Sequence, residues 1–374
     1  MIATDTPAVL IVDPINILYA TGASNMTVWS SRTQARYLLL FAEGPVVLYD
    51  FFGCEHLAQD LPTIDQIRPA RGLCFTSSND QTEKNAKKVA AEIHSLMKQH
   101  VGTERRLAVD RFSFAFTDAL RAEGLLLSDA DPVFYHARKN KLVVEIAYMR
   151  EAMRRVETAV ESFYNAVTPG KTESEVWAEF YKGLISGEGQ YIATRLMQSG
   201  SNTFPYFQEC GNRVLEHGDL VCLDTDALGF HGYAVDFSRS YLCGDLRPSP
   251  QQQVLYSRAR EQLEHNMALI KPGKTYEEIA SDAWNIPDEH QDSRYYCIGH
   301  GLGMSGERPN IPYKIKDEPY PLEGVIEPGM VICIESYIGS SEADQGVKLE
   351  QQLLVTEDST ECMSQAGFDH RFSQ

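Results

Sequence analysis

The sequence predicts an α+β protein in which the larger, C-terminal domain has two helix pairs around an antiparallel sheet. One observation is a repeat: an amphipathic helix, a Pro-Gly turn and a capped helix occur at residues 142–177 and again from residue 255. A second is that runs of apolar and β-branched residues, typical of strands, follow each copy. A third is that residues 1–135 alternate short apolar runs with one charged helix. We therefore expect an α/β N-terminal domain at 1–135 and a catalytic domain at 136–374.

The N-terminal domain is expected to contain several short elements. Its predicted strands are residues 8–12, ended by Asp13-Pro14, and residues 107–109. Two further runs, 37–41 and 46–49, flank Glu43-Gly44-Pro45 and predict a hairpin. Residues 83–100 predict a charged helix.

The repeat in the C-terminal domain rests on helix signals. After a polar linker at 136–141, apolar residues follow the i, i+3, i+4, i+7 rule over residues 142–163. The turn at 168–170 precedes Thr172, which forms a capping box with Glu175. The same pattern returns at 271–275 with Glu278. This favours an internal duplication, although a Pro-Gly turn with a cap is also a common connector between helices.

Composition excludes several functional classes. The 374 residues carry 34 basic and 52 acidic side chains, a formal charge of −18, which argues against nucleic acid and anionic membrane surfaces as partners. No apolar run is long enough to predict a transmembrane helix. The eight cysteines lack CxxC spacing, which argues against a thiolate zinc site. Scattered cysteines and the absence of a signal-peptide pattern favour a reducing, cytoplasmic compartment.

Three aspartates are close together in the sequence. Asp224 closes an apolar run, and Asp226 shares its face if the strand continues. Gly229 and Gly232 allow a hairpin that would bring Asp236 back beside them. Converging carboxylates repel each other unless a cation lies between them. An exposed acidic hairpin is the alternative, but the apolar run before Asp224 disfavours it.

Three further residues extend the series. His300 lies between glycines, Glu335 follows the apolar strand 330–334, and Glu350 lies in a third strand. Singly, each is weak evidence, because a lone His is commonly a satisfied core residue. Together, carboxylates and one imidazole suit Mn, Fe, Co or Zn. Bridging carboxylates suit two ions about 3.5–4 Å apart.

At these residues the chain resembles the creatinase, prolidase and methionine aminopeptidase superfamily, the pita-bread fold. The resemblance covers roughly residues 139–356, and the N-terminal region is similar to the companion domain of the prolidase and creatinase branch. It implies that Asp236 and Glu350 bridge two metal ions. Asp224 would bind one ion, and His300 and Glu335 the other.

Within the superfamily, the sequence is similar to the DddP type of dimethylsulfoniopropionate (DMSP) lyase. The peptidases usually have Gly where this chain has Asp226, and the lyases have a metal-binding acid there. Segments 25–29 and 205–211 are also similar. Five carboxylates carry −5, so two divalent ions leave −1. We hypothesise that the extra acid favours ferric iron or a cationic substrate group. Iron is therefore expected, with manganese, zinc and cobalt as alternatives.

The resemblance implies a lyase that cleaves DMSP to dimethyl sulfide and acrylate. The lyases have a basic aspartate six residues after the metal His, where this chain has Gly306. Glu307 and Tyr295 are therefore the candidate bases, although Tyr295 and Tyr296 could equally pack in a strand. One alternative is an Xaa-Pro dipeptidase or aminopeptidase, disfavoured by the missing second His. Another is a non-catalytic binding protein, disfavoured by the full ligand set.

The small-molecule substrate is expected to contact three residues. Trp29 could hold a sulfonium group against its ring, and the resemblance implies that it acts across a homodimer. A buried core tryptophan is the alternative. Tyr206 and Glu209 lie in the lyase-like segment 205–211. Arg239 is expected to orient a carboxylate near the metals.

Overall fold

The computed structural model describes residues 1–372, and the chain divides into two compact units between Arg138 and Lys139. The expected boundary at 135/136 falls inside helix α6 (Asp131–Arg138), so the first residues of the expected linker are helical. In the part of the chain that the structure describes, no helix is both long and apolar enough to cross a membrane.

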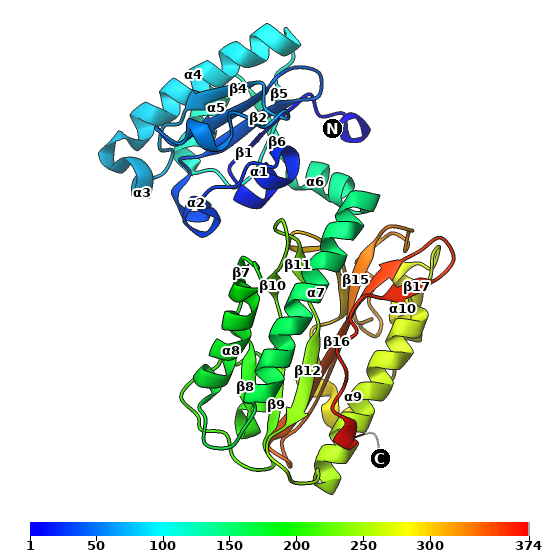
Figure 1. The fold of residues 1–374 in the computed structure, drawn as a ribbon. Coiled ribbons are helices and arrows are strands. Elements are labelled where there is room, and N and C mark those ends of the chain that lie inside the picture. Colours follow the sequence, from blue (N-terminus) through cyan, green and yellow to red (C-terminus); the bar gives the residue numbers. More distant parts are fainter. Residues whose placement is uncertain (373–374) are drawn as a thin grey trace. The chain divides into compact units, whose positions relative to one another are not determined.

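The N-terminal unit is built on one six-stranded sheet of order β4-β3-β2-β1-β5-β6 (Figure 1). The predicted hairpin is confirmed, since β2 and β3 pair antiparallel. β1 pairs antiparallel with β2 and parallel with β5. The strands are β1 (Ala8–Ile11), β2 (Tyr37–Phe41), β3 (Val46–Asp50), β4 (Gln66–Pro69), β5 (Arg106–Val109) and β6 (Leu126–Asp129).

Helices cover both faces of this sheet. The predicted charged helix is α4 (Thr82–Val101), which packs with α5 (Phe114–Ala122) on one face through Ile93 and Phe116. On the other face, α1 (Pro14–Thr21) and α6 contribute Ile17 and Phe134. Two short helices, α2 (Thr27–Thr33) and α3 (Phe75–Ser78), complete the unit.

The C-terminal unit has the two predicted helix pairs. The first is α7 (Val143–Ala166) with α8 (Glu173–Ser186), and the second is α9 (Pro250–Leu269) with α10 (Tyr276–Asp282). Both expected capping boxes form, because Thr172 and Thr275 each cap the helix that follows and accept from its third residue. The local sequence at both turns is therefore sufficient to start a helix.

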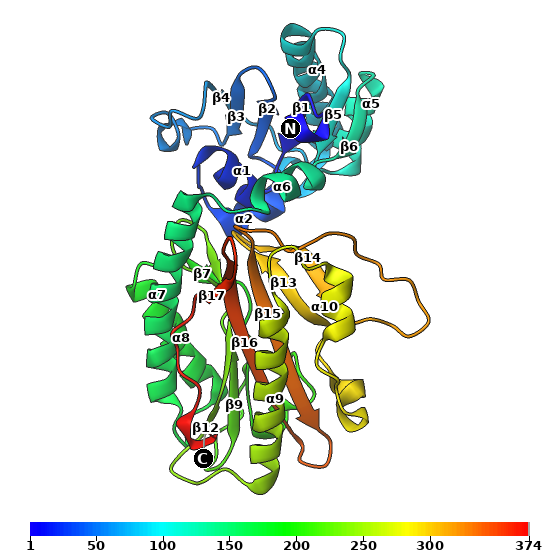
Figure 2. The same cartoon turned by 90° about the vertical axis from the view of Figure 1, so that its right-hand side faces the viewer.

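Three sheets lie between these helix pairs: β14-β13-β15-β16-β17, β12-β9-β8 and β11-β10-β7. α9 runs along β15 and β16 in Figure 2, and its Leu263 shares a core with Ile334. On the other side, Phe163 of α7 contacts Tyr241 of β12. The strands are β7 (Tyr191–Ile192), β8 (Met197–Ser199), β9 (Leu220–Asp224), β10 (Ala227–Leu228), β11 (Ala234–Val235), β12 (Ser238–Leu242), β13 (Cys297–Leu302), β14 (Gly306–Pro312), β15 (Val331–Ser340), β16 (Gln345–Val355) and β17 (Thr360–Cys362).

A serine joins β12 to β16. The hydroxyl of Ser240 accepts from the backbone N–H of Lys348 at 3.0 Å and donates to its carbonyl at 2.8 Å. These side-chain hydrogen bonds join β12 to β16, where backbone hydrogen bonds would join two strands of one sheet. They connect the sheet that carries Asp224 to the sheet that carries Glu335 and Glu350.

Two strand-like runs of the sequence have limits that only the structure shows. The run 233–241 is interrupted at Asp236, which lies between β11 and β12. β15 continues to Ser340, so Glu335 lies in the middle of a strand and not at its end. Residues 335–339 are buried like residues 331–334, because the strand continues under α9.

Candidate metal centre

Strand register places four polar side chains on one face of the five-stranded sheet. His300 of β13 pairs with Cys333 of β15, and Glu335 pairs with Glu350 of β16. Because side chains alternate along a strand, Cys333 and Glu335 point to the same face. The tertiary fold thus brings together residues that are up to 50 positions apart in the sequence.

The β9–β12 pair supplies the aspartates. Asp224 is the last residue of β9 and pairs with Ser238, two residues after Asp236. The expectation that Asp226 continues the same strand is wrong, because its backbone turns to φ 37° between β9 and β10. Asp226 still lies near Asp224, and burial and then the charge of Asp224 raise the pKa of Asp226. A hydrogen bond of 2.6 Å from Thr194 holds its carboxylate.

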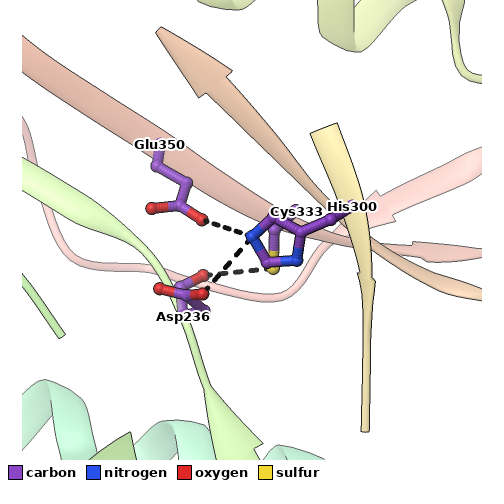
Figure 3. Close-up of side chains that lie close together, drawn as sticks. All are labelled: Asp236, His300, Cys333 and Glu350. Carbon is purple, nitrogen blue, oxygen red and sulfur yellow. Dashed lines mark hydrogen bonds and ion pairs between the residues drawn. The ribbon is translucent and has the colours of Figure 1, made fainter. Parts of the chain in front are cut away.

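The imidazole of His300 lies close to three of the acids, and Figure 3 shows it beside two of them, Asp236 and Glu350. Its Nε2 is 3.3 Å from Glu335, 3.5 Å from Asp236 and 3.9 Å from Glu350. Donor atoms of His300, Asp236, Glu350 and Cys333 lie within 4.8 Å of one another, a group that could hold a metal ion. The structure thus brings three of the acids named from the sequence to within 4 Å of His300.

Two oxygen atoms show how well the site fits a cation. Asp236 Oδ1 and Glu350 Oε1 are buried, and neither has a hydrogen-bond partner among the described residues. A buried carboxylate oxygen without a partner is costly unless a positive charge satisfies it. The oxygen and imidazole donors suit Mn, Fe, Co or Zn.

The charges of the site perturb its pKa values. Burial and then the neighbouring carboxylates raise the pKa of Asp236 and Glu350 far above the ordinary range. Burial and Asp224 raise the pKa of Asp226 to about 7. Burial alone would lower the pKa of His300, but its hydrogen bond to Glu335 and the nearby acids raise it to about 9. The metal-free site therefore holds protons that metal ions would displace.

Sequence reasoning missed two polar residues of this site. Cys333 lies within an apolar run, which is typical of a small core residue, yet it is two positions before Glu335 on the ligand face. Lys348 lies two positions before Glu350, and its side chain is fully buried. The two-residue period of a buried strand was a signal that could have identified both.

A group of aromatic side chains lies beside the acids. Tyr206 donates a 2.6 Å hydrogen bond to Asp224. Its ring centroid is 4.6 Å from that of Phe207 and 5.7 Å from that of Tyr295, which is 4.9 Å from that of Tyr296. Tyr295 and Tyr296 precede β13 and do not pack inside a strand. Tyr206 and Tyr295, both named from the sequence, thus lie beside the ligand residues.

The remaining named residues have other surroundings. Glu307 accepts a 2.8 Å hydrogen bond from the Lys141 ammonium, and both side chains are almost fully buried. Glu209 is exposed, with its backbone bridged to Leu196. Arg239 donates to the backbone carbonyl of Glu350, so it positions the strand and not a carboxylate.

Trp29 lies in the N-terminal unit. Its side chain on α2 is 52 % exposed and its ring centroid is 5.2 Å from that of Phe51. The alternative of a buried core tryptophan is therefore wrong for this chain.

A pita-bread fold with a carboxylate and imidazole cluster at the centre of its sheets defines a metal-dependent enzyme. The sequence matches metallopeptidase family M24 over residues 147–357. The chain belongs to this family. The expected superfamily and α+β fold are thereby confirmed.

Relatives extend the match beyond the catalytic unit. The chain is 33 % identical over 370 residues to a protein of Roseovarius nubinhibens named dimethylsulfoniopropionate lyase DddP, covering 98 % of this chain and 83 % of that protein. It is 30 % identical over 231 residues to an Xaa-Pro dipeptidase of Pyrococcus furiosus, covering 61 % of this chain and 63 % of that protein. The solved prolidase of Pyrococcus furiosus matches the fold with a TM-score of 0.77 at 22 % identity, over 98 % of each chain.

Proposed function

We propose that this chain is a metal-dependent lyase that cleaves DMSP to dimethyl sulfide and acrylate. The observation that carries the proposal is the aromatic group, Tyr206, Phe207, Tyr295 and Tyr296, next to the carboxylate cluster. An aromatic surface holds a sulfonium cation well, and a metal-bearing cluster holds the carboxylate at the other end of the same small molecule. The near full-length likeness to proteins named DMSP lyases supports the assignment.

The residues that would hold two metal ions are Asp224, Asp226, Asp236, His300, Glu335 and Glu350. Bound ions would supply a Lewis acid for the substrate carboxylate. They would also neutralise the acids that, together with burial as the larger cause, raise the pKa of Tyr295. We propose iron as the metal, with manganese, zinc or cobalt as alternatives.

The protein's own residues would carry the elimination. A base takes the proton next to the substrate carboxylate, the electron pair forms the C=C bond, and the C–S bond breaks to release neutral dimethyl sulfide. Tyr295 is the base that we favour, because the Lys348 ammonium, 4.8 Å from its ring centroid, and the bound ions would stabilise its phenolate, whereas Lys141 holds Glu307 at 2.8 Å. Tyr206 would orient Asp224 and face the substrate.

Two substrate contacts remain proposals from the sequence. Glu209 lies three residues after Tyr206 in segment 205–211, and Trp29 belongs to the N-terminal unit. We propose that Trp29 acts on the site of a second chain in a homodimer, for which its half-exposed ring is available.

The test is an assay of metal-loaded protein with DMSP, in which headspace dimethyl sulfide is measured by gas chromatography. Release by the wild type and not by Asp236→Ala supports the lyase. Tyr295→Phe should abolish release while Glu307→Gln retains it, and the reverse result would assign the base to Glu307. No release by a fully metal-loaded wild type would overturn DMSP as the substrate.

The second candidate function is hydrolysis of Xaa-Pro dipeptides. It is favoured by the likeness to an Xaa-Pro dipeptidase in sequence and to a prolidase in fold. Against it, the stretch 303–309 keeps Glu307 and Pro309 of the peptidase pattern but lacks its second His. The same protein preparation, given Xaa-Pro dipeptides, separates the two functions by its products.

A further inference from the structure

Lys348 is a cation built into the centre of the acid cluster. Its side chain is fully buried, and its Nζ lies 2.5 Å from Glu335, 3.0 Å from Glu350 and 3.6 Å from Asp224. A buried ammonium is stable only where anions surround it. These three partners are all residues that we assign to the metal centre.

The position of Lys348 is set by the fold. Ser240 holds its backbone N–H and carbonyl, and Ser238 accepts a 2.8 Å hydrogen bond from its Nζ. The ammonium also lies 4.8 Å from the ring centroid of Tyr295 and 5.6 Å from that of Tyr206. Hydrogen bonds and aromatic rings thus hold the charge beside the acids.

Lysine and histidine face different oxygens of the two glutamates. Lys348 contacts Oε2 of Glu335 and of Glu350, whereas His300 lies nearer to Oε1 of each. Glu350 Oε1, on the histidine side, is the oxygen without a hydrogen-bond partner. The lysine therefore satisfies one side of these carboxylates and leaves the other side free for a metal ion.

This arrangement changes the charge balance of the centre. Asp224, Asp226, Asp236, Glu335 and Glu350 carry −5, and Lys348 reduces the sum to −4. Within residues 1–372, Lys348 and His300 are the two basic side chains that pair with these acids. A sum of −4 matches two divalent ions, so Asp226 requires no ferric ion to balance it.

We propose that Lys348 is a specificity-determining residue whose fixed charge offsets that of Asp226 and so selects divalent over trivalent metal ions. The inference rests on the proposed two-metal centre but is independent of the substrate. It replaces the hypothesis that the extra acid calls for a more highly charged ion.

The experiment is a competition between a divalent and a trivalent probe. Metal-free protein is incubated with Mn²⁺ and citrate-buffered Ga³⁺, and bound metals are counted by mass spectrometry after gel filtration. The variants are Lys348→Met, Asp226→Asn, their double mutant, and Lys348→Arg as the control that keeps the charge. Circular dichroism establishes that each variant is folded.

Opposite charge changes should give opposite shifts. Lys348→Met should raise the Ga³⁺ to Mn²⁺ ratio at least about tenfold, because a unit charge a few ångströms away is removed from a poorly screened site. Asp226→Asn should lower the ratio, the double mutant should return toward the wild type, and Lys348→Arg should resemble it. If Lys348→Met does not fold, the direction in which Asp226→Asn changes the Ga³⁺ to Mn²⁺ ratio still tests the proposal.

An unchanged ratio in Lys348→Met, or a raised ratio in Asp226→Asn, would overturn the proposal. Less than two metal ions per wild-type chain would overturn the two-metal centre itself. A wild type that shows the expected ratios but releases no dimethyl sulfide would refute the DMSP lyase and leave the role of Lys348 intact.

Discussion

The two units bury charge in opposite ways. In the N-terminal unit, Arg36 and Asp50 form a pair at 3.1 Å whose side chains are 1 % and 0 % exposed. One cation matches one anion, so the charges balance, although Asp50 Oδ2 has no hydrogen-bond partner among the described residues. In the C-terminal unit, five buried or half-buried acids surround one lysine and one histidine. The difference teaches that an excess of buried charge, and not burial of charge as such, indicates a site for an added cation.

The largest expected effect separates metal binding from folding. Asp236→Ala should lower metal content and reduce dimethyl sulfide release by roughly 1000-fold or more, because several kcal/mol of metal-derived stabilisation is lost. The metal-free variant should be at least as stable as the metal-free wild type, since one repelling carboxylate is gone. Metal analysis, gas chromatography and thermal unfolding measure the three quantities. A metal-free variant that is markedly less stable would mean that the acids form a structural network.

Removal of one buried charge should destabilise the N-terminal unit, in contrast to its effect on the metal-free C-terminal unit. Arg36→Met leaves Asp50 buried and uncompensated, which should lower the free energy of unfolding by about 3–5 kcal/mol. Metal content should not change. Urea unfolding of the metal-free protein measures the effect, and the double variant Arg36→Met/Asp50→Leu should recover most of the loss. Equal stability of Arg36→Met and wild type would remove the contrast between the units.

A smaller effect is expected for the hydroxyl that holds Asp224. Tyr206→Phe removes the 2.6 Å hydrogen bond and should weaken metal affinity about 10- to 100-fold, because outer contacts orient metal ligands. Tyr337→Phe is the matched control, since its hydroxyl donates to the backbone carbonyl of Thr203 and contacts no ligand. Titration of both variants with Mn²⁺ gives the affinities. The same loss in both would show that the effect is one of packing.

The smallest expected effect is a pH dependence confined to the metal-free protein. Folding raises the pKa of Asp226 from 3.8 to about 7 and that of His300 from 6.5 to about 9. Between each pair of values the folded state binds more protons than the unfolded state, so stability falls as pH rises through 3.8–7 and through 6.5–9. The lowered pKa of Asp224 acts in the opposite direction, but only below pH 3.8, and the raised pKa of Lys348 acts in the same direction above pH 10.5.

Thermal unfolding at pH 6 and pH 9 tests this dependence. The melting temperature of the metal-free protein should be lower at pH 9 by roughly 5 °C. Asp226→Asn should flatten the part of the curve below pH 7. A saturating divalent ion should reverse the trend, because it binds the deprotonated ligands. A metal-free protein with a flat profile would contradict the raised pKa values.

Much of the fold followed from local signals. The hairpin of β2 and β3, the charged helix α4 and the two capping boxes each depend on residues that are adjacent in the chain. The limits that were missed depend on distant partners. β15 continues past Glu335 because α9 covers it, and the strand around Asp236 breaks where two sheets meet.

The metal-ligand candidates could be named from the sequence because each is an acid or imidazole at a strand or a glycine turn, and because their order resembles that of the superfamily's ligands. Their chemistry belongs to the residue types and persists wherever the chain places them. The charge of the centre could not be obtained in this way. In the sequence Asp226 is a fifth acid without a matching cation, because nothing near Lys348 indicates that its side chain is buried among the acids.

The sequence by itself thus determined the fold class, the helix caps and the acids and imidazole that can bind metal. Only the tertiary structure decided which strands meet at β12 and β16, and so placed Lys348 and Cys333 among the ligands. The physical reason is the separation along the chain of the residues that interact. Helix caps and hairpins involve residues a few positions apart, whereas the electrostatic balance of a buried site is a sum over side chains from strands far apart in the chain.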